Sequence, residues 1–328
     1  MTVLVTGGAG YIGSHTALAL CDAGEDVVIL DDLSTGFDFM VPDRATFVRG
    51  DVADAALVSS LITTHHIESV LHFAAKIVVS DSVAHPLDYY LANTTRTRAL
   101  LETVTRAGIR HFIFSSTAAV YGEKDNEPLG EDMTLAPINP YGRSKLMSEW
   151  MLEDAASATG LRFAILRYFN VVGADARGRS GETTLPATHL VKIAARTALG
   201  KHPLLSVFGT DYPTPDGSCV RDYVHVSDLA DAHVAALNHL RQGAPRLTVN
   251  CGYGHGFSVR EVIEVVKRVS GVDFPVKIAP RRAGDPAVLI ADNRRIIDIL
   301  RWAPHYDDLD AIVAHALQWE RQLTARGL

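Results

Sequence analysis

The chain has 328 residues, of which 47% are hydrophobic, and its formal net charge is −7 at pH 7. This apolar content can bury a large core and argues against disorder, and the negative charge without a long basic run argues against nucleic acid or an anionic membrane surface as the main partner. A compact negative substrate can still bind a local cluster of arginines.

The cysteines and the hydropathy pattern bear on the compartment. Cys21, Cys219 and Cys251 stand far apart with no CxxC pair, so neither a disulfide framework nor a zinc site is indicated, and we expect no bound metal. The first strand pattern begins at residue 2, which leaves no room for a leader, and no apolar run approaches membrane-spanning length. We therefore expect a soluble protein of the reducing cytoplasm.

Short apolar runs alternate with longer helical patterns in the first half of the chain, which is typical of βαβ units. The runs are nearly continuous in Val, Ile, Leu and Phe, as expected when helices cover both faces of a parallel sheet. We therefore predict an α/β fold with a Rossmann-type, doubly wound parallel sheet. The predicted strands cover residues 2–6, 27–31, 45–49, 69–74, 111–116 and 162–168, and the predicted helices cover residues 14–23, 55–65 and 94–107.

Beyond about Asn170 this alternation gives way to loops rich in Gly, Pro and Asp, which predict a smaller α/β substrate-binding region. We place a dinucleotide-binding domain at residues 1–170, to which later segments return, and the substrate-binding region mainly at residues 171–328. One compact body with a cleft is expected. The predicted helices here cover residues 186–199, 227–240, 258–270, 294–300 and 310–323, and the predicted strands cover residues 247–250 and 276–278.

A glycine-rich turn follows the first predicted strand and opens the first predicted helix. Gly7, Gly10 and Gly13 form GxxGxxG, and Gly8 replaces Gly7 in an overlapping GxGxxG. One glycine permits a tight turn, Gly10 lets backbone amides approach a pyrophosphate, and Gly13 permits close helix packing. A plain glycine turn is the alternative, but the flanking strand and helix favour a dinucleotide site.

Acidic residues end the next two predicted strands. Asp31 stands eighteen residues beyond Gly13 and is followed by Asp32, at a place where a carboxylate accepts hydrogen bonds from an adenosine 2′-hydroxyl and repels a 2′-phosphate. The sequence therefore favours NAD over NADP, although a solvated acidic loop also explains Asp32. Asp51 and Val52 are placed to meet the adenine, with ordinary turn chemistry as the alternative.

The segment 139–145 places a phenol and an ammonium on one helix face. Asn139 and Pro140 are a good helix start, so Tyr141 and Lys145 are i and i+4 residues. A free phenol has a pKa near 10, and both a nearby ammonium and a positive nicotinamide favour the phenolate. Thr117, at the end of the fifth predicted strand, can relay a proton to Tyr141. The alternative for Tyr141 and Lys145 is a packed ring and a lysine that reaches water.

Between residue 2 and about residue 292 the chain contains the motifs TGGAGYIG, DDLS, HFAA, SSTAAVYG, NPYGRSK, RYFN, VFG, VRDYVHVSDLA and PRRAGD. The resemblance that they carry is to the extended short-chain dehydrogenase/reductase family and, within it, to the UDP-glucose 4-epimerases. It implies epimerisation at C4 of a UDP-hexose by a tightly held NAD. Tyr141 takes the proton of the 4-hydroxyl, a 4-keto sugar forms and turns over, and hydride and proton return. Thr117 assists, and Lys145 holds the nicotinamide ribose.

The resemblance also implies a set of cofactor contacts. Lys76 stands one place earlier than the family's lysine, and Ala92 replaces the first of two paired asparagines, which leaves open the roles of Lys76 and Asn93. The implied cofactor contacts are Gly7, Gly10, Tyr11, Ile12, Gly13, Asp31, Asp32, Thr35, Gly36, Asp51, Val52, Phe73, Ala74, Ala75, Asn93 and Phe169.

For the nucleotide sugar, the resemblance implies two arginines that balance a diphosphate and a carboxylate that accepts ribose hydroxyls. The implied residues are Asn170, His189, Phe208, Arg221, Arg282 and Asp285. Surface ion pairs are the alternative for the arginines, and a core or surface histidine is the alternative for His189. Leu289, of middling size, predicts UDP-glucose and UDP-galactose as main substrates with poor use of N-acetylated forms, and it leaves UDP-pentoses and UDP-uronates open.

Two other functions are less consistent with these residues. A sugar-nucleotide 4,6-dehydratase carries an Asp-Glu pair where this chain has Ala118 and Ala119. A catalytically silent dinucleotide sensor has no need of the complete set of Thr117, Tyr141 and Lys145. The family is commonly homodimeric through two long helices, one of which bears Tyr141, and we expect a homodimer here.

Overall fold

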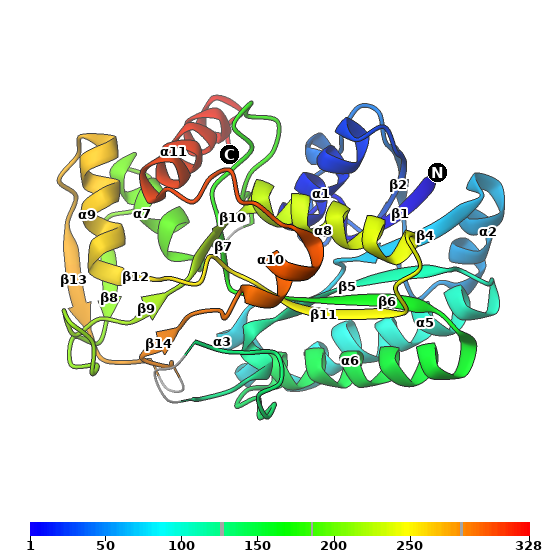
Figure 1. The fold of residues 1–328 in the computed structure, drawn as a ribbon. Coiled ribbons are helices and arrows are strands. Elements are labelled where there is room, and N and C mark those ends of the chain that lie inside the picture. Colours follow the sequence, from blue (N-terminus) through cyan, green and yellow to red (C-terminus); the bar gives the residue numbers. More distant parts are fainter. Residues whose placement is uncertain (125–127, 185, 283–284) are drawn as a thin grey trace.

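The computed structural model describes residues 1–124, 128–184, 186–282 and 285–328 (Figure 1). Ala283 and Gly284 of the PRRAGD motif lie outside the described residues. Among the described residues, no helix is both long enough and apolar enough to cross a membrane.

A seven-stranded parallel sheet forms the centre of the molecule (Figure 1). Its order is β11-β6-β5-β4-β1-β2-β3, so the chain moves outward from β1 on one side and then returns to add β4, β5, β6 and β11 on the other. The doubly wound sheet expected from the sequence is confirmed, and its switch point between β1 and β4 is where such sheets bind ligands, at the carboxyl ends. The strands are β1 (Thr2–Thr6), β2 (Asp26–Asp31), β3 (Thr46–Arg49), β4 (Ile67–His72), β5 (His111–Thr117), β6 (Arg162–Tyr168) and β11 (Arg246–Cys251).

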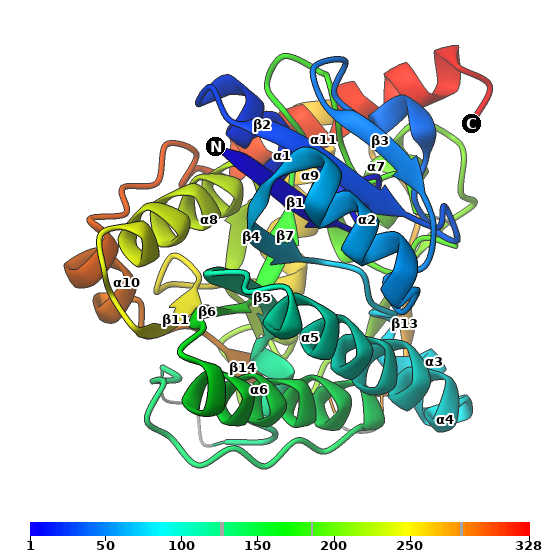
Figure 2. The same ribbon diagram turned by 90° about the vertical axis from the view of Figure 1, so that its right-hand side faces the viewer.

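Both faces of the sheet are buried because its strands are apolar on both sides. Val3 and Val5 of β1 belong to one hydrophobic cluster, and Leu4 between them belongs to the other. This alternation follows from the two-residue period of a strand. Helices α1 (Tyr11–Asp22) and α8 (Val226–Arg241) cover the first face, and α2 (Ala55–His65), α5 (Arg96–Arg106) and α6 (Pro140–Thr159) cover the second (Figure 2).

A smaller group of short strands and helices adjoins the carboxyl edge of the sheet (Figure 1). Three helices of this group, α7 (Leu190–Ala198), α9 (Val259–Ser270) and α11 (Leu309–Ala325), pack against one another. The strands pair as β7 with β10, β8 with β13, and β12-β9-β14. The bounds are β7 (Asn170–Val172), β8 (Leu205–Phe208), β9 (Val220–Arg221), β10 (Tyr223–His225), β12 (Phe257–Ser258), β13 (Val276–Ala279) and β14 (Val288–Leu289), with α10 (Arg294–Leu300) beside β11.

The observed elements differ from the predicted ones mainly where polar side chains reshape the backbone. The helix predicted over 94–107 is preceded by a π-helical turn, η2 (Tyr90–Thr95). Within that turn Asn93 is buried. Its side-chain oxygen accepts the backbone amide of Lys76, and its side-chain nitrogen donates to the carbonyl of Lys76, so the turn is tied to the segment after β4. The helix predicted over 186–199 begins only at Leu190. Short helices α3 (Val79–Ala84), α4 (Pro86–Tyr89), η1 (Asp38–Met40) and η3 (Ala118–Val120) were not predicted.

Substitution of Gly13 by Ala tests the packing at the start of α1. An alanine inside a helix usually stabilises it relative to glycine, but a Cβ at Gly13 lies 2.2 Å from the carbonyl oxygen of Gly7. We expect Gly13→Ala to lower the free energy of unfolding by about 1–3 kcal/mol in urea titration. Gly130→Ala is the control, because its Cβ meets its nearest atom only at 4.0 Å. Equal stability of the two variants contradicts the argument.

Candidate active site

The glycine-rich turn lies against the ends of β1 and β4 with no room for side chains. Gly7 has a φ of +71°, and a Cβ there would lie 2.5 Å from the amide nitrogen of Ala74. Gly10 is the N-cap of α1 and offers no side chain to the free amides of the first turn. The first-turn amides are therefore available to an anion at this helix end. These features fit the pyrophosphate of a dinucleotide.

Asp31 fixes the shape of this turn and of the loop that follows β2. Its carboxylate accepts the amide of Ala9 at 2.9 Å and the amide of Leu33 at 2.8 Å, and only 7% of the residue is exposed. Burial raises the pKa of Asp31, and the two amide bonds act in the opposite direction. The chain then passes close to the glycine turn again, because a Cβ at Gly36 would lie 2.8 Å from the backbone of Ala9.

A single arginine joins the acidic residues at the ends of β2 and β3. The guanidinium of Arg96 lies 3.2 Å from the carboxylate of Asp51 and 3.9 Å from that of Asp32. Val52 is buried beside Asp51. The structure thus brings Asp31, Asp32 and Asp51 to the sheet edge that holds the glycine turn.

The other predicted cofactor residues differ in what their side chains already bind. The hydroxyl of Tyr11 donates to the carbonyl of Gly173 at 2.7 Å, so this ring ties α1 to the loop after β7. Phe73 packs against the ring of His233, and Phe169 is buried in a cluster with Ala118. Ile12 and Ala75 are partly buried near the same turns, and Thr35 is exposed. The side chain of Asn93 is fully engaged by protein groups, since it also donates to Ser144.

One face of α6 packs against the carboxyl end of β5. As predicted, Asn139 caps this helix by accepting the amide of Gly142 at 2.8 Å, with Pro140 in the first turn. The Nζ of Lys145 donates to the carbonyl of Ser115 at 2.8 Å. One turn further along the same face, Glu149 accepts the hydroxyl of Ser116.

The third contact of this face joins Tyr141 to the last residue of β5. The Thr117 hydroxyl is near enough to the phenol to lower its pKa. Tyr141, Lys145 and Glu149 therefore engage three consecutive residues of β5. We call this set of contacts the α6–β5 contact.

Burial controls the ionisation of Tyr141 and Lys145. It raises the pKa of Tyr141 to about 12, with Thr117 acting in the opposite direction. It lowers the pKa of Lys145 to about 7, and the carboxylate of Glu149 opposes that shift. Among these protein groups desolvation of the phenolate has the largest effect on the pKa of Tyr141. That an ammonium and a bound nicotinamide together favour the phenolate stays a prediction.

A buried ion pair lies behind this face and was missed by the sequence reasoning. The guanidinium of Arg167 on β6 binds both carboxylate oxygens of Glu149, at 3.1 and 2.7 Å, and their side chains are only 5% and 2% exposed. Arg167 also donates to the hydroxyl of Tyr121 at 3.1 Å. The available signal was the spacing 141, 145 and 149, which places a glutamate on the buried face of the helix.

Four of the predicted nucleotide-sugar residues gather around β8, β9 and the loop before β14. Arg221 is 7% exposed and pairs with Asp285, while its guanidinium also donates to the carbonyl of Pro286 at 2.7 Å. The guanidinium of Arg282 lies over the ring of Phe208, 3.9 Å from its centroid.

Of the remaining three, Leu289 pairs with Arg221 of this group across β14 and β9, whereas Asn170 and His189 lie on other elements. His189 binds the carboxylate of Glu182 at 2.7 Å, which raises the pKa of the imidazole. The backbone amide of Asn170 donates to Asp222, and Leu289 packs against the buried cluster that contains Phe169.

Residues 3–252 match the NAD dependent epimerase/dehydratase family. The chain belongs to this family. The UDP-glucose 4-epimerase of Azospirillum brasilense is 55% identical to this family member over 321 residues, which are 98% of this chain and 92% of that protein. The resemblance inferred from the motifs is therefore confirmed.

Solved structures agree with this assignment. The crystal structure of UDP-glucose 4-epimerase from Brucella ovis in complex with NAD is 45% identical, covers 97% of each chain and superposes with a TM-score of 0.94. The UDP-Glc/GlcNAc 4-epimerase from Campylobacter jejuni is 47% identical, covers 98% of this chain and 99% of its own, and has a TM-score of 0.86.

Substitution of Glu149 by Gln tests the buried ion pair in this epimerase/dehydratase family member. It leaves the guanidinium of Arg167 buried without its counter-charge, so we expect the free energy of unfolding to fall by about 3–5 kcal/mol. Glu102→Gln is the matched control, because Glu102 pairs with Arg98 and Arg106 at the surface and should contribute at most about 1 kcal/mol. Urea titrations give both values, and a loss for Glu149→Gln no larger than the control would contradict the role of this pair.

The pH dependence of stability tests the burial of Lys145. Its pKa of about 7 in the folded protein lies below the ordinary value of 10.5, so between these pH values the unfolded chain binds the additional proton. The free energy of unfolding should therefore rise with pH across this window. Lys145→Met should flatten the rise, and an unchanged slope would show that this lysine is not the group responsible.

Proposed function

We propose that this protein interconverts UDP-galactose and UDP-glucose by inverting C4 of the hexose, with a tightly held NAD that is regenerated in each turnover. The relatives with the same fold that are named UDP-glucose 4-epimerases support this function. The observation that carries it is the α6–β5 contact, which places a phenol, an ammonium and a threonine hydroxyl at the sheet edge that holds the glycine turn.

The residues of the sheet edge fit NAD. The first turn of α1 offers amides to the pyrophosphate, and Asp31 and Asp32 disfavour a 2′-phosphate on the adenosine ribose. Because its hydroxyl is bound to the carbonyl of Gly173, Tyr11 contributes to NAD binding through its backbone. Lys145 uses one of its three donors on Ser115 and has the others for the nicotinamide ribose.

Tyr141 is the proton acceptor for the 4-hydroxyl of the sugar, and Thr117 bridges the two. With a pKa of about 12 the phenol keeps its proton at neutral pH, so its action as a base requires positive charge close to its oxygen. The ammonium of Lys145 provides part of this charge, and NAD provides the remainder when bound and carries the hydride between the two faces of C4. Tyr141 returns the proton when the 4-keto sugar is reduced.

The nucleotide part of the substrate is assigned to the second group of residues. Arg221 and Arg282 face the diphosphate, Asp285 binds ribose hydroxyls, and Phe208 supports Arg282 from below its guanidinium plane. Asn170 and His189 complete the substrate contacts. Residues 1–170 form the NAD-binding domain, to which β11 and α8 return, and residues 171–328 mainly bind the UDP-sugar.

Leu289 bears on the breadth of substrates. Its side chain packs next to Phe169 and Ala118, close to the end of β5, where it limits the room beside the sugar. UDP-glucose and UDP-galactose are therefore the main substrates, and N-acetylated forms react poorly. Product analysis with a panel of UDP-hexoses, UDP-N-acetylhexosamines, UDP-pentoses and UDP-uronates tests this. Equal turnover of UDP-N-acetylglucosamine would contradict it, and no turnover of UDP-galactose would overturn the proposed function.

Tyr141→Phe separates chemistry from cofactor binding. It removes only the proton-transfer group, so turnover of UDP-galactose should fall by at least about 100-fold while bound NAD is retained. Initial rates and the NAD content of the purified protein are measured together, with Tyr90→Phe as a control that alters a tyrosine of the neighbouring η2 turn. A rate within a few-fold of the wild type would remove Tyr141 from the reaction.

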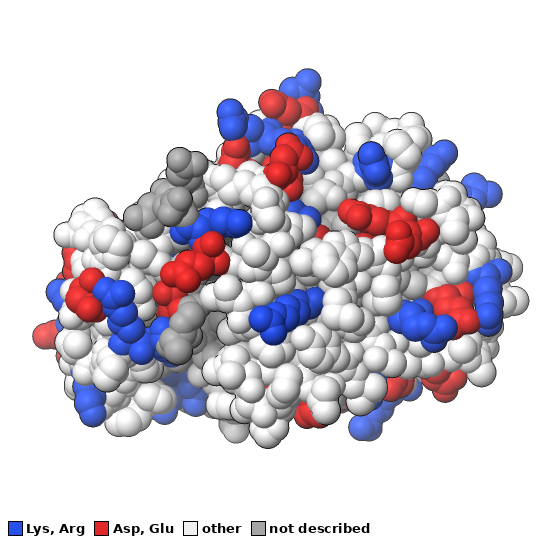
Figure 3. Space-filling view, turned by 90° about the horizontal axis from the view of Figure 1, so that it is seen from below, with Lys and Arg blue, Asp and Glu red and all other residues white. Residues whose placement is uncertain are grey.

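The exposed side of α6 supports a homodimer. Met147 and Trp150 on α6 are 40% and 54% exposed, and Leu87 and Leu91 on the adjoining α4 and η2 are 78% and 52% exposed. The molecular face that includes α6 carries broad uncharged areas between scattered charges of both signs (Figure 3). A second copy of this chain covers this apolar surface. The buried free cysteines suit a reducing compartment.

Trp150→Glu tests this interface. A carboxylate at the centre of an apolar contact is costly to desolvate, so we expect the variant to be monomeric while the wild type sediments at twice 35.5 kDa. Asp154→Glu serves as the control because it preserves the charge at the end of the same helix. A wild-type protein that sediments as a monomer at micromolar concentration contradicts the proposed dimer.

A further inference from the structure

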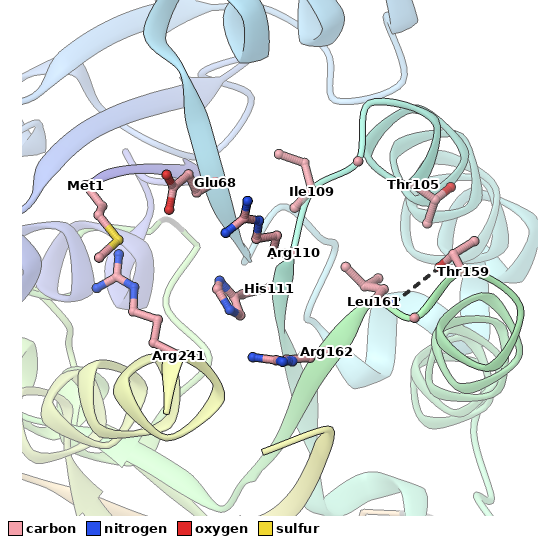
Figure 4. Close-up of a pocket in the computed structure, with 12 residues that line it drawn as sticks. Met1, Glu68, Thr105, Ile109, Arg110, His111, Thr159, Leu161, Arg162 and Arg241 are labelled. Carbon is pink, nitrogen blue, oxygen red and sulfur yellow. Dashed lines mark hydrogen bonds between the residues drawn. The ribbon is translucent and has the colours of Figure 1, made fainter. Parts of the chain in front are cut away.

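A cavity of about 500 Å³ lies at the opposite end of the central sheet from the proposed active site. Its floor is formed by the amino ends of β4, β5 and β6, and its walls are the ends of α5, α6 and α8 (Figure 4). This volume lies within the range of sites that hold small molecules. Residues 111–117 of β5 separate the cavity from Thr117, so the two sites occupy opposite ends of the same strand.

Three arginines line the cavity around one histidine. Arg110, His111 and Arg162 come from neighbouring strand ends, and Arg241 reaches the cavity from the last turn of α8. Their side chains point into the same space (Figure 4). Burial lowers the pKa of His111, and the charges of Arg241, Arg162 and Arg110 lower it further. The imidazole therefore lies in a positive field, although the chain as a whole is acidic.

The nearby carboxylates accept few of the hydrogen bonds that these arginines can donate. Glu25 binds Arg241 through two hydrogen bonds, at 2.6 and 3.0 Å, but the Nε of Arg241 is buried with no partner. Glu68 also lines the cavity, yet within residues 1–124, 128–184, 186–282 and 285–328 it forms no ion pair with the arginines.

The two strand arginines are even less engaged. Within the described part of the chain, the guanidinium of Arg162 makes only a long bond of 3.3 Å to the carbonyl of Leu240. Among the described residues Arg110 has no ion pair and no side-chain hydrogen bond. The guanidinium groups thus converge on a space where the protein itself supplies too few acceptors.

The opposite wall has a different character. Thr105 and Thr159 stand in the last turns of α5 and α6, where their hydroxyls donate to helix carbonyls and keep oxygen lone pairs that can accept hydrogen bonds. Hydroxyl groups suit this wall, where the lining residues Thr105, Ile109, Thr159 and Leu161 carry no charge. A ligand that fits both walls carries an anionic group on one side and hydroxyls on the other.

We propose that this cavity binds the phosphate group of a small phosphorylated polyol, with Arg110, Arg162 and the Nε of Arg241 as donors and Thr105 and Thr159 beside the hydroxyl groups. Phosphate is favoured because planar guanidinium groups bind its oxygens in a forked geometry. The site is separate from the epimerase chemistry and stands whether or not the proposed function is correct.

Calorimetry and NMR on the NAD-loaded full-length protein test this proposal, with UDP present to fill the diphosphate positions of the active site. The probes are inorganic phosphate and glycerol 3-phosphate, which separate a free anion from a phosphorylated polyol. We expect both to bind and to raise the pKa of His111, read from its ring signal and assigned with His111→Gln. The ester should bind more tightly than free phosphate.

The double variant R110Q/R162Q is expected to weaken binding of both probes by at least about tenfold, which corresponds to the loss of one charge-assisted contact. Arg98→Gln, an exposed arginine of α5 outside the cavity, should leave the affinity unchanged. Binding that leaves the His111 signal unmoved, equal affinity in the double variant, or no binding at tens of millimolar probe would each overturn the proposal.

Discussion

The structure depends on one contact, the packing of a single face of α6 against the last three residues of β5. Tyr141, Lys145 and Glu149 are spaced four residues apart, and they meet Thr117, the carbonyl of Ser115 and the hydroxyl of Ser116. A helix face and a strand end that are both rigid hold these groups more precisely than loops can. The position of the phenol at the sheet edge follows from this contact.

The α6–β5 contact buries charged side chains, and neighbouring residues of opposite charge offset the cost of removing them from water. Lys145 lies in a dry position where its ammonium is costly, and Glu149 provides a counter-charge that is itself paired with Arg167. The network extends through Tyr121 and Asn250 to β11, which joins the sheet late in the sequence. A returning C-terminal strand thus supports groups that a helix from the first half of the chain presents.

The limits of several helices and strands could be predicted from the sequence, because they depend on the local pattern of residues. The strand at 162–168 and the helix at 294–300 have the predicted limits, and the capped start of α6 is where Asn139 and Pro140 indicate. Long-range pairing could not be predicted: nothing local links Glu149 to Arg167, or the hydroxyl of Tyr11 to Gly173. The rise of the phenol pKa on burial could not be predicted either, because burial is a property of the folded chain and not of the i, i+4 spacing.

Transfer of deuterium from UDP-galactose labelled at C4 tests the central claim most directly. If hydrogen leaves C4 as hydride, is held beside Tyr141 without exchange and returns to the other face, the UDP-glucose formed in ordinary water keeps the label at C4. Product formed in D₂O from unlabelled substrate then contains no deuterium at C4. Loss of the label to solvent, or its gain from solvent, would contradict reversible oxidation at this carbon.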